Sequence, residues 1–313
     1  MERSAAIGVD VGGTTTSAGL VDPDGAVLAH RSAPTHARGA GTALDTAFDL
    51  IAQVDAVARS RGIAVAGVGI GVPGTADVDA GVVGADIHHV PELASVPIAA
   101  LVSQRFGVPA FVDNDANVLA LGEWTWGAAR GARSLVLLAI GTGVGAGIVL
   151  GGRVERGRAG FAGELGHVPI DFEGRPCICG GRGCLEMYVA GPDIAREGSR
   201  RLGRPVEAGE VFELAARGDS AVRPVVDRAC EALAAGLAMI VNGLNPEAIV
   251  LAGSVAKSLV PLESDLRRRL ARRAFARALD GTHIGILALD KDATVRGGAA
   301  LLRCEVARRS APP

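Results

Sequence analysis

Residues 5–21 read Ala-Ala-Ile-Gly-Val-Asp-Val-Gly-Gly-Thr-Thr-Thr-Ser-Ala-Gly-Leu-Val, two apolar segments separated by a glycine–threonine turn. Residues 5–10 form a short apolar run that ends in an acid, and residues 17–21 are apolar again. The pattern predicts a buried strand, a tight turn and a returning strand. Glycine-rich turns between strands present several backbone N–H groups to one point, a geometry that suits phosphate oxygens.

The same pattern occurs again about 130 residues later. Residues 134–140 predict a strand, Gly141-Thr-Gly-Val-Gly145 a turn, and residues 146–150 a returning strand. Two copies of one unit predict a duplicated α/β fold whose two turns face each other across a cleft. We expect a small first domain of residues 1–112, completed by a C-terminal helix at 297–313, and a larger second domain of residues 113–296.

Apolar periodicity and turn residues indicate the remaining elements. Strands are expected at 27–28, 65–72, 110–112 and 248–251, and helices at 42–60, 97–106, 116–126, 192–202, 211–217, 221–241, 262–277 and 299–308.

Three glycine-containing segments are candidates for phosphate binding, and the third, Gly253-Ser254, precedes a helix. A single glycine hairpin is more often only a tight turn, but three in one chain favour the functional interpretation. Neither a Walker-type nor a Rossmann pattern is present. The candidate residues are Gly12, Gly13, Thr14, Thr15, Gly141, Thr142, Gly143, Gly145 and Gly253. Asp10, beside the first turn, either holds a hydrated magnesium ion or makes a simple hydrogen bond at the strand end.

Asp113-Asn114-Asp115 follows a predicted strand and opens a predicted helix. Either aspartate can cap the helix. With phosphate-binding turns elsewhere in the chain, the alternative is that one of them accepts the proton of an attacking hydroxyl in phosphoryl transfer.

Three of the five cysteines lie within eight residues, and His167 lies ten residues before the first of them. His167, Cys177, Cys179 and Cys184 offer one nitrogen and three sulfurs from a glycine-rich loop, the donor set of a closed tetrahedral zinc site. A disulfide with a loose thiol, or chance clustering of the cysteines, is the alternative. Because carboxylates bracket the thiols, we expect the metal to hold a polar loop rigid rather than to do the chemistry.

Composition excludes several classes of protein. Apolar residues make up 49% of the 313 residues, which indicates a globular chain, and 32 Lys and Arg against 34 Asp and Glu leave no basic surplus for nucleic acid or anionic membrane. The start lacks an apolar segment of signal-peptide length, and glycines interrupt the longest apolar run. An odd number of cysteines without an export signal favours the cytoplasm.

Taken in order along the chain, these motifs resemble the ROK family of sugar kinases and regulators, which has the actin/hexokinase-like (ribonuclease H-like) fold. The resemblance covers nearly the whole chain, and Glu164-Leu-Gly-His167 with the cysteine motif is close to diagnostic for it. The other matching motifs are Asp10-Val-Gly-Gly-Thr-Thr15, Gly71-Val-Pro-Gly74, Val112-Asp-Asn-Asp-Ala-Asn117, Gly122-Glu123, Gly141-Thr-Gly-Val-Gly-Ala-Gly147, Cys184-Leu-Glu186 and Gly297-Gly-Ala-Ala300.

The resemblance implies roles for single residues. Asp115 is the expected catalytic base, and His167 is expected to bind zinc through one ring nitrogen and a sugar hydroxyl through the other. The sugar-binding residues it implies are Gly74, Asn114, Asp115, Glu164, His167 and Glu186. It also implies ATP and Mg²⁺, a structural Zn²⁺, and a homodimer or homotetramer.

The expected function is therefore ATP-dependent phosphorylation of a primary hydroxyl of a hexose, with glucose as the first candidate. Residues 85–90, Ala-Asp-Ile-His-His-Val, replace the Pro-Asn-Leu and tryptophan common in family glucokinases, which keeps other hexoses, N-acetylhexosamines and cyclitols open. A sugar-responsive transcription regulator is disfavoured because the first strand begins by Ala5 and leaves no room for a helix-turn-helix domain. A sugar-binding protein without turnover is the third alternative.

Overall fold

The computed structural model describes residues 4–85, 87, 89–288 and 292–310 of the chain. It divides into two compact units, which confirms the expected two-domain α/β class. The first unit comprises Met1–Gly131, Arg153–Phe161 and Asp290–Pro313, and the second comprises Ala132–Gly152 and Ala162–Leu289. Residues 113–131 belong to the first unit, whereas the sequence predicts them in the second. The reason is that helix α3 (Asp115–Thr125) packs along helix α11 (Ala293–Ser310).

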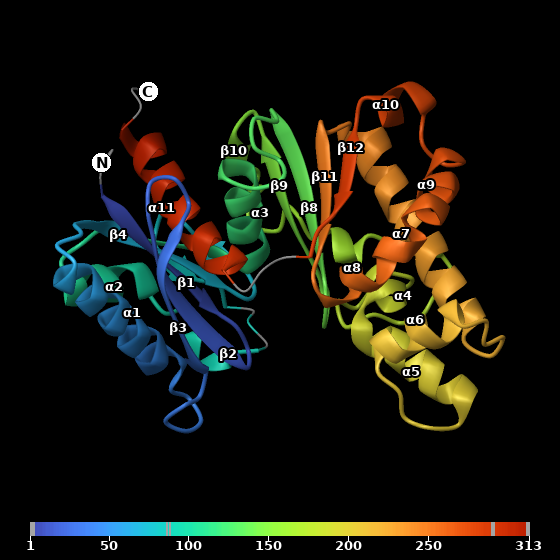
Figure 1. The fold of residues 1–313 in the computed structure, drawn as a ribbon, viewed down its shortest axis with the longest axis horizontal. Coiled ribbons are helices and arrows are strands. Elements are labelled where there is room, and N and C mark those ends of the chain that lie inside the picture. The colour runs from blue at the N-terminus through green and yellow to red at the C-terminus, as the bar shows by residue number, and fades with distance from the viewer. Residues whose placement is uncertain (1–3, 86, 88, 289–291, 311–313) are drawn as a thin grey trace. The chain divides into compact units, whose positions relative to one another are not determined.

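A five-stranded sheet forms the centre of the first unit (Figure 1). Its order is β3-β2-β1-β4-β7, in which β1 pairs antiparallel with β2 and parallel with β4, and β4 pairs parallel with β7. The strands are β1 (Ala5–Val11), β2 (Thr15–Val21), β3 (Val27–Pro34), β4 (Val65–Val72) and β7 (Ala110–Asn114). A short hairpin, β5 (Ala76–Asp77) and β6 (Val82–Val83), follows β4.

Helices cover both faces of this sheet. The period-two alternation of β1 directs Ile7 and Val9 into a core shared with α1 (Ala43–Ser60) and α2 (Ile98–Phe106), and directs Ala6 into a second core shared with α3 and α11. A short 3-10 helix, Pro91–Leu93, precedes α2.

Helix α11 begins at Ala293, six residues before the expected start, so that Gly297 and Gly298 lie inside the helix and not in front of it. A Cβ atom at Gly69 would collide with the carbonyl oxygen of Gly298. The backbones of the helix and strand β4 therefore touch, and this close packing overrides the low helix propensity of glycine.

The second unit repeats the sheet of the first. The order of this second sheet is β10-β9-β8-β11-β12, with an antiparallel β8–β9 pair beside parallel strands β11 and β12. Its edge strand β10 consists of residues 153–154, which are assigned to the first unit. The strands are β8 (Ser134–Ile140), β9 (Val144–Leu150), β10 (Arg153–Val154), β11 (Ala248–Ala252) and β12 (His283–Ile286). The duplication predicted from the two strand–turn–strand segments is confirmed by this shared order.

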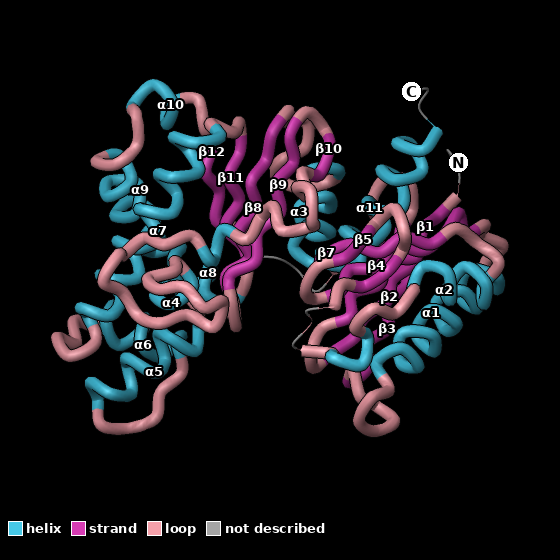
Figure 2. Tube along the Cα trace, turned by 180° about the vertical axis from the view of Figure 1, so that it is seen from behind, coloured by secondary structure: helices cyan, strands magenta, loops and turns pink. Residues whose placement is uncertain are grey.

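Helices of the second unit pack on this sheet around one large apolar core. Figure 2 shows α7 and α9 side by side next to β11 and β12. The helices are α4 (Glu186–Val189), α5 (Gly191–Leu202), α6 (Ala208–Ala216), α7 (Arg223–Leu244), α8 (Ser254–Leu259), α9 (Glu263–Ala271) and α10 (Ala276–Asp280), with short 3-10 turns at Leu165–His167 and Val260–Leu262.

The single helix expected at residues 262–277 is two helices, α9 and α10. Asn242, near the end of α7, stabilises the break between them. Its Oδ1 accepts a hydrogen bond from the amide of Phe275 at 2.9 Å, and its Nδ2 donates to the carbonyl of Arg273 at 3.1 Å. Backbone groups that a continuous helix would have satisfied are thus bonded from outside.

None of the helices among the described residues is long and apolar enough to cross a membrane.

Candidate active site

The first glycine turn joins β1 to β2 in the first unit. The amide of Gly12 donates to the carbonyl of Thr15 at 3.0 Å, which closes the turn. Thr35 is fully buried and stabilises the turn, since its hydroxyl donates a hydrogen bond to the carbonyl of Gly12 at 2.6 Å. Thr16 is also buried, and its hydroxyl lies 3.0 Å from that of Thr35. The turn is therefore a fixed loop.

Asp10 is the acid at the end of β1, immediately before this turn. Burial raises its pKa from 3.8 to about 7, and the negative charge of Asp115 adds to the rise, while a hydrogen bond from Thr294 of α11 opposes it. Asp10 is thus placed where two carboxylates share a poorly solvated space. A divalent cation bound there would relieve both the desolvation and the repulsion.

Asn114 organises the junction between β7 and α3. It is the N-cap of α3: its Oδ1 accepts from the amides of Ala116 and Asn117 at 2.9 and 3.1 Å. Its Nδ2 donates to the carbonyl of Gly74 at 3.0 Å and to Oδ1 of Asp115 at 3.1 Å. The N-cap residue is therefore the asparagine, and Asp115 shares the amide of Ala116 with it.

The two aspartates have different surroundings. Asp113 is 1% exposed, and its Oδ2 accepts from the guanidinium of Arg156 at 2.7–2.8 Å. Asp115 is only partly buried and is the first residue of α3, and its Oδ1 accepts from the amide of Ala116 at 2.7 Å. Of the two, only Asp115 is accessible enough to meet a substrate hydroxyl.

The second glycine turn joins β8 to β9 in the second unit. Gly141 donates to the carbonyl of Gly143 at 2.9 Å and accepts from the amide of Gly191 at 2.8 Å. Oε2 of Glu186 accepts from the amide of Val144 at 2.8 Å, and a Cβ atom at Gly143 would lie 2.8 Å from that same oxygen. Glu186, an expected sugar ligand, is thus positioned by the second glycine turn itself.

Gly253 forms the third glycine segment, between β11 and α8. Its φ is +102°, and a Cβ atom there would collide with the carbonyl oxygen of Ile140, so that only glycine fits. The hydroxyl oxygen of Ser254 would be 3.6 Å from a Cβ atom at Gly141. The second and third glycine segments therefore converge within the second unit.

His167, Cys177, Cys179 and Cys184 form one cluster in the second unit. Their ligand atoms all lie within 4.8 Å of one another, and the cysteines are not disulfide-bonded. Nδ1 of His167 is 3.4 Å from Sγ of Cys177, and the sulfurs of Cys179 and Cys184 are 3.6 Å apart. In a tetrahedral zinc site, with Zn–S bonds of about 2.3 Å, neighbouring ligand atoms lie about 3.5–3.8 Å apart. The donor set and its spacing fit zinc.

The thiols need a cation if they are to be ionised. Burial raises the pKa of Cys184 to about 12 and that of Cys177 above its usual range, while the amide of Gly181 lowers that of Cys179. A bound metal would hold all three as thiolates. Nε2 of His167 is directed the other way, 3.9 Å from a carboxylate oxygen of Glu164.

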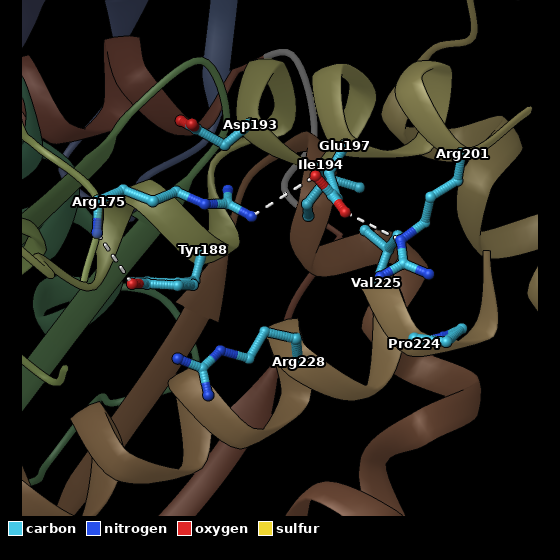
Figure 3. A pocket seen from close by; sticks show the side chains of 9 residues that line it. All are labelled: Arg175, Tyr188, Asp193, Ile194, Glu197, Arg201, Pro224, Val225 and Arg228. Atoms are coloured by element: carbon cyan, nitrogen blue, oxygen red, sulfur yellow. Dashed lines mark hydrogen bonds and ion pairs between the residues drawn. The ribbon is translucent and has the colours of Figure 1, made fainter. Parts of the chain in front are cut away.

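A pocket of about 100 Å³ lies between α4, α5 and α7, with Arg175 of the cysteine loop on its wall (Figure 3). Inside it, the guanidinium carbons of Arg175 and Arg228 lie 5.2 and 4.9 Å from the ring centre of Tyr188. The Tyr188 hydroxyl donates to Asp171 at 3.0 Å and accepts from the amide of Arg175 at 3.3 Å. None of the predicted site residues lines it. Its contacts hold the cysteine loop on α4, the helix that begins with Glu186.

Sequence reasoning missed Thr35, Arg156 and Thr294. Each acts on a site residue that is distant in the chain, and none lies in a recognisable motif. Thr35 follows an ordinary strand, Arg156 is one of several arginines in its segment, and Thr294 stands in the first turn of α11.

Two α/β units with the same strand order, a glycine turn at the matching place in each, and an aspartate at a strand-to-helix junction are the features of the two-domain sugar kinases and their relatives. The chain belongs to the ROK family, whose pattern matches residues 6–305.

Curated relatives and solved structures match over nearly the full length. A glucokinase of Halalkalibacterium halodurans is 33% identical over 95% of this chain and 94% of its own. The ROK hexokinase of Thermus thermophilus has a TM-score of 0.83 at 32% identity, covering 97% of this chain and 99% of that one. A ROK glucokinase of Streptomyces griseus, solved with glucose and AMPPNP, has a TM-score of 0.76 at 30% identity, covering 95% and 99%. A xylose repressor of Bacillus spizizenii also matches, at 27% identity over 95% of this chain and 76% of its own.

Proposed function

We propose that this protein is an ATP-dependent sugar kinase that transfers the γ-phosphoryl group to a primary hydroxyl of a hexose, with glucose as the first substrate to test. The observation that carries the proposal is the different environment of two neighbouring aspartates. Asp113 is locked in a buried ion pair, whereas Asp115 stands at the start of α3, close enough to Asp10 for its charge to act on that residue. The structure of the Streptomyces griseus relative with glucose and AMPPNP supports both substrates.

The proposed mechanism assigns Asp115 as the base that accepts the proton of the sugar hydroxyl as it attacks the γ-phosphorus. Asn114 orients this carboxylate through its Nδ2. A sugar hydroxyl that binds Asn114, as proposed, takes the place of one of the four hydrogen bonds that its amide group makes. The glycine turns supply backbone N–H groups to the phosphate oxygens. The proposed ATP-binding residues are Asp10, Gly12, Gly13, Thr14, Thr15, Gly141, Thr142, Gly143, Gly145 and Gly253.

Sugar hydroxyls are proposed to bind Gly74, Glu164, His167 and Glu186 in addition to Asn114 and Asp115. Nδ1 of His167 is directed to the cysteines and Nε2 to Glu164, so that one ring can hold zinc on one side and a hydroxyl on the other. Zinc would supply rigidity here, since four protein ligands leave no open position for chemistry. As in the family generally, we propose a homodimer or homotetramer.

The deciding experiment measures ADP formation from ATP with purified protein against glucose, other hexoses, N-acetylhexosamines and cyclitols. Turnover with glucose at least as fast as with the others supports the proposal. ADP formation with another sugar only would keep the kinase and replace the substrate.

A transcription regulator is the second candidate, because xylose repressors share the family. The same assay separates the two functions. Sugar binding detected by calorimetry without ADP formation from any of these substrates would contradict the kinase and favour a regulator or a sugar-binding protein.

Asp10 is the proposed residue that holds hydrated Mg²⁺ beside the phosphates. Because its pKa is raised to about 7 in the folded protein, ionised Asp10 destabilises the metal-free protein above its unfolded pKa, and this penalty grows until the pH passes about 7. We therefore expect Asp10→Asn to raise the melting temperature, less at pH 5 than at pH 8, where the penalty is fully present. A rise from 3.8 to about 7 corresponds to at most about 4 kcal/mol.

Thermal denaturation from pH 5 to pH 8, with and without Mg²⁺, tests this expectation. Mg²⁺ should stabilise the unmodified protein at pH 8 and have little effect on Asp10→Asn. The exposed Asp24→Asn is the matched control and should show neither effect. A pH-independent difference between Asp10→Asn and the unmodified protein would contradict the proposed environment of Asp10.

The loop at residues 85–90 is proposed to select among sugars. His88 lies outside the described residues, while His89 is exposed, and its Cβ would be 3.0 Å from a Cβ atom at Gly13. His89 thus lies next to the first glycine turn. We expect the double change His88→Ala and His89→Ala to alter the ranking of kcat/KM across hexoses and cyclitols more than it alters the affinity for ATP.

The exposed His283→Ala, on β12 of the other unit, is the control. An unchanged ranking in the double variant would show that the loop does not select the substrate, and an equal loss of ATP affinity would assign the loop to the phosphates instead.

A further inference from the structure

Arg156 lies in a segment with an unusual position in the chain. Residues 153–161 belong to the compact first unit, although the residues before and after them belong to the second. Arg156 is the charged anchor of this segment. Its Nε and Nη2 donate to Oδ2 of Asp113 at 2.8 and 2.7 Å, and Nη2 also donates to Oε1 of Glu305 on α11 at 2.9 Å.

The partners of Arg156 are nearly inaccessible to solvent. The side chains of Asp113 and Glu305 are 2% and 3% exposed, and that of Arg156 itself is 22% exposed. Burial raises the pKa of Asp113, and the guanidinium opposes that rise. Two buried carboxylates converge on one cation, so that removal of Arg156 would leave both without their shared counter-charge. Glu305 keeps a second partner, since Nε of Arg308 lies 2.7 Å from its other oxygen.

Asp113 links Arg156 to the junction between β7 and α3 through hydrogen bonds. Its second oxygen, Oδ1, accepts from the amide of Asn114 at 2.8 Å and from Nδ2 of Asn117 at 3.0 Å. Asn114 in turn holds Oδ1 of Asp115 with its Nδ2 at 3.1 Å. A continuous series of hydrogen bonds therefore runs from Arg156 through Asp113 and Asn114 to the carboxylate of Asp115.

Strand pairing brings the same junction close to Asp10. Asp10 on β1 is opposite Gly71 on β4, and Gly71 is opposite Asp113 on β7. Asp10 and Asp113 thus lie near the ends of β1 and β7, on either side of Gly71 on β4, and Asp115 follows at the start of α3. Arg156 binds Asp113 directly. A shift of the unanchored Asp113 would move the junction that sets the distance between Asp115 and the reacting phosphoryl group.

We propose that Arg156 is a positioning residue for phosphoryl transfer, which holds Asp115 in its reactive orientation by fixing Asp113 and Asn114. The inference rests on the proposed role of Asp115 as the base. Arg156 does not touch the reacting atoms in this scheme, and it acts on the catalytic step rather than on ATP binding.

The test compares four single variants, together with one double variant and Asp115→Asn, in steady-state kinetics with glucose and ATP. Because a misplacement of about 1 Å can cost on the order of 100-fold in rate, Arg156→Gln should lower kcat roughly 10- to 100-fold. Its KM for ATP should stay within about threefold, since the proposed ATP contacts are unchanged. Arg156→Lys, which keeps the charge, should recover part of kcat. Glu305→Gln, which removes the other partner of Arg156, should lower the melting temperature and leave kcat within about threefold.

The fourth variant, Asp113→Asn, completes a double-mutant cycle with Arg156→Gln. If Arg156 acts through Asp113, the double variant should have a kcat no lower than that of Arg156→Gln alone, because the interaction is lost only once. Additive losses of kcat would overturn the proposal. The proposal would also be overturned if Arg156→Gln had nearly the kcat of the unmodified protein, or if Glu305→Gln lowered kcat as much as Arg156→Gln does.

Two further outcomes are decisive. If Arg156→Gln does not fold, Asp113→Asn, which weakens the same ion pair, carries the test: a lowered kcat with an unchanged KM for ATP supports positioning, and an unchanged kcat refutes it. Asp115→Asn is measured in parallel. Full activity of that variant refutes the base assignment, whereas loss of its activity together with a normal Arg156→Gln refutes only the positioning role.

Discussion

Asp115→Asn is expected to lower kcat roughly 10²- to 10⁴-fold, the usual contribution of a positioned general base. The amide keeps the size of the side chain, and its oxygen can still accept from the amide of Ala116, so the N-terminus of α3 should remain folded. Affinities for glucose and for AMPPNP should change no more than a few-fold, because only proton acceptance is lost. Pre-steady-state phosphoryl transfer and equilibrium binding measure the two effects separately.

Asp113→Asn is the matched comparison for this prediction. Its carboxylate is buried against Arg156 and cannot meet the substrate, so its replacement should cost less in kcat than Asp115→Asn and more in stability. Near-normal turnover of Asp115→Asn would refute the base assignment. If the loss appeared instead at Asp113→Asn, Asp113 would become the candidate base.

Much of the fold was predictable because its signals are local. In each of the two strand–turn–strand segments, two short runs of mostly apolar residues are joined by a glycine turn. This local pattern identifies the duplicated sheets without knowledge of distant contacts. The Cys/His cluster was predictable for the same reason, since its four ligands come from residues 167–184, a single loop.

Features that depend on distant contacts were not predictable. Thr35 bonds Gly12 across 23 residues, and Arg156 bonds Asp113 across 43 residues, and neither partner indicates the other in the sequence. The early start of α11 depends on close packing of glycines against β4, which intrinsic propensity argues against. The division of one expected helix into α9 and α10 depends on a single side chain of α7, Asn242.

Loss of zinc is expected to have the second large effect, because residues proposed to bind sugar lie at both ends of the cysteine loop. The carbonyl of Gly183 accepts from the amide of Ile170 at 2.8 Å, and the amide of Leu185 donates to the carbonyl of Val168 at 3.0 Å. The segment around Cys184 is thereby paired with the segment after His167. Glu186 follows Cys184 by two residues and opens α4. A metal that joins His167 to Cys184 would thus fix the distance between His167 and Glu186, two of the proposed sugar ligands.

We therefore expect the protein to contain one zinc per chain, and Cys184→Ser to lose it, since serine replaces one of the three sulfur ligands. The affinity for sugar should fall about 10- to 100-fold, as is usual when the support of a site is removed, while ATP affinity changes less. Cys230→Ser, also buried in the second unit but outside the cluster, is the control. It should lower the melting temperature through its buried hydroxyl and keep both zinc and sugar affinity. Elemental analysis measures the zinc content, and calorimetry measures the affinity for sugar. An active protein without zinc would contradict the prediction, and so would equal sugar affinities in the two serine variants. Either result would mean that the cysteine loop does not need a metal to hold Glu186 and His167.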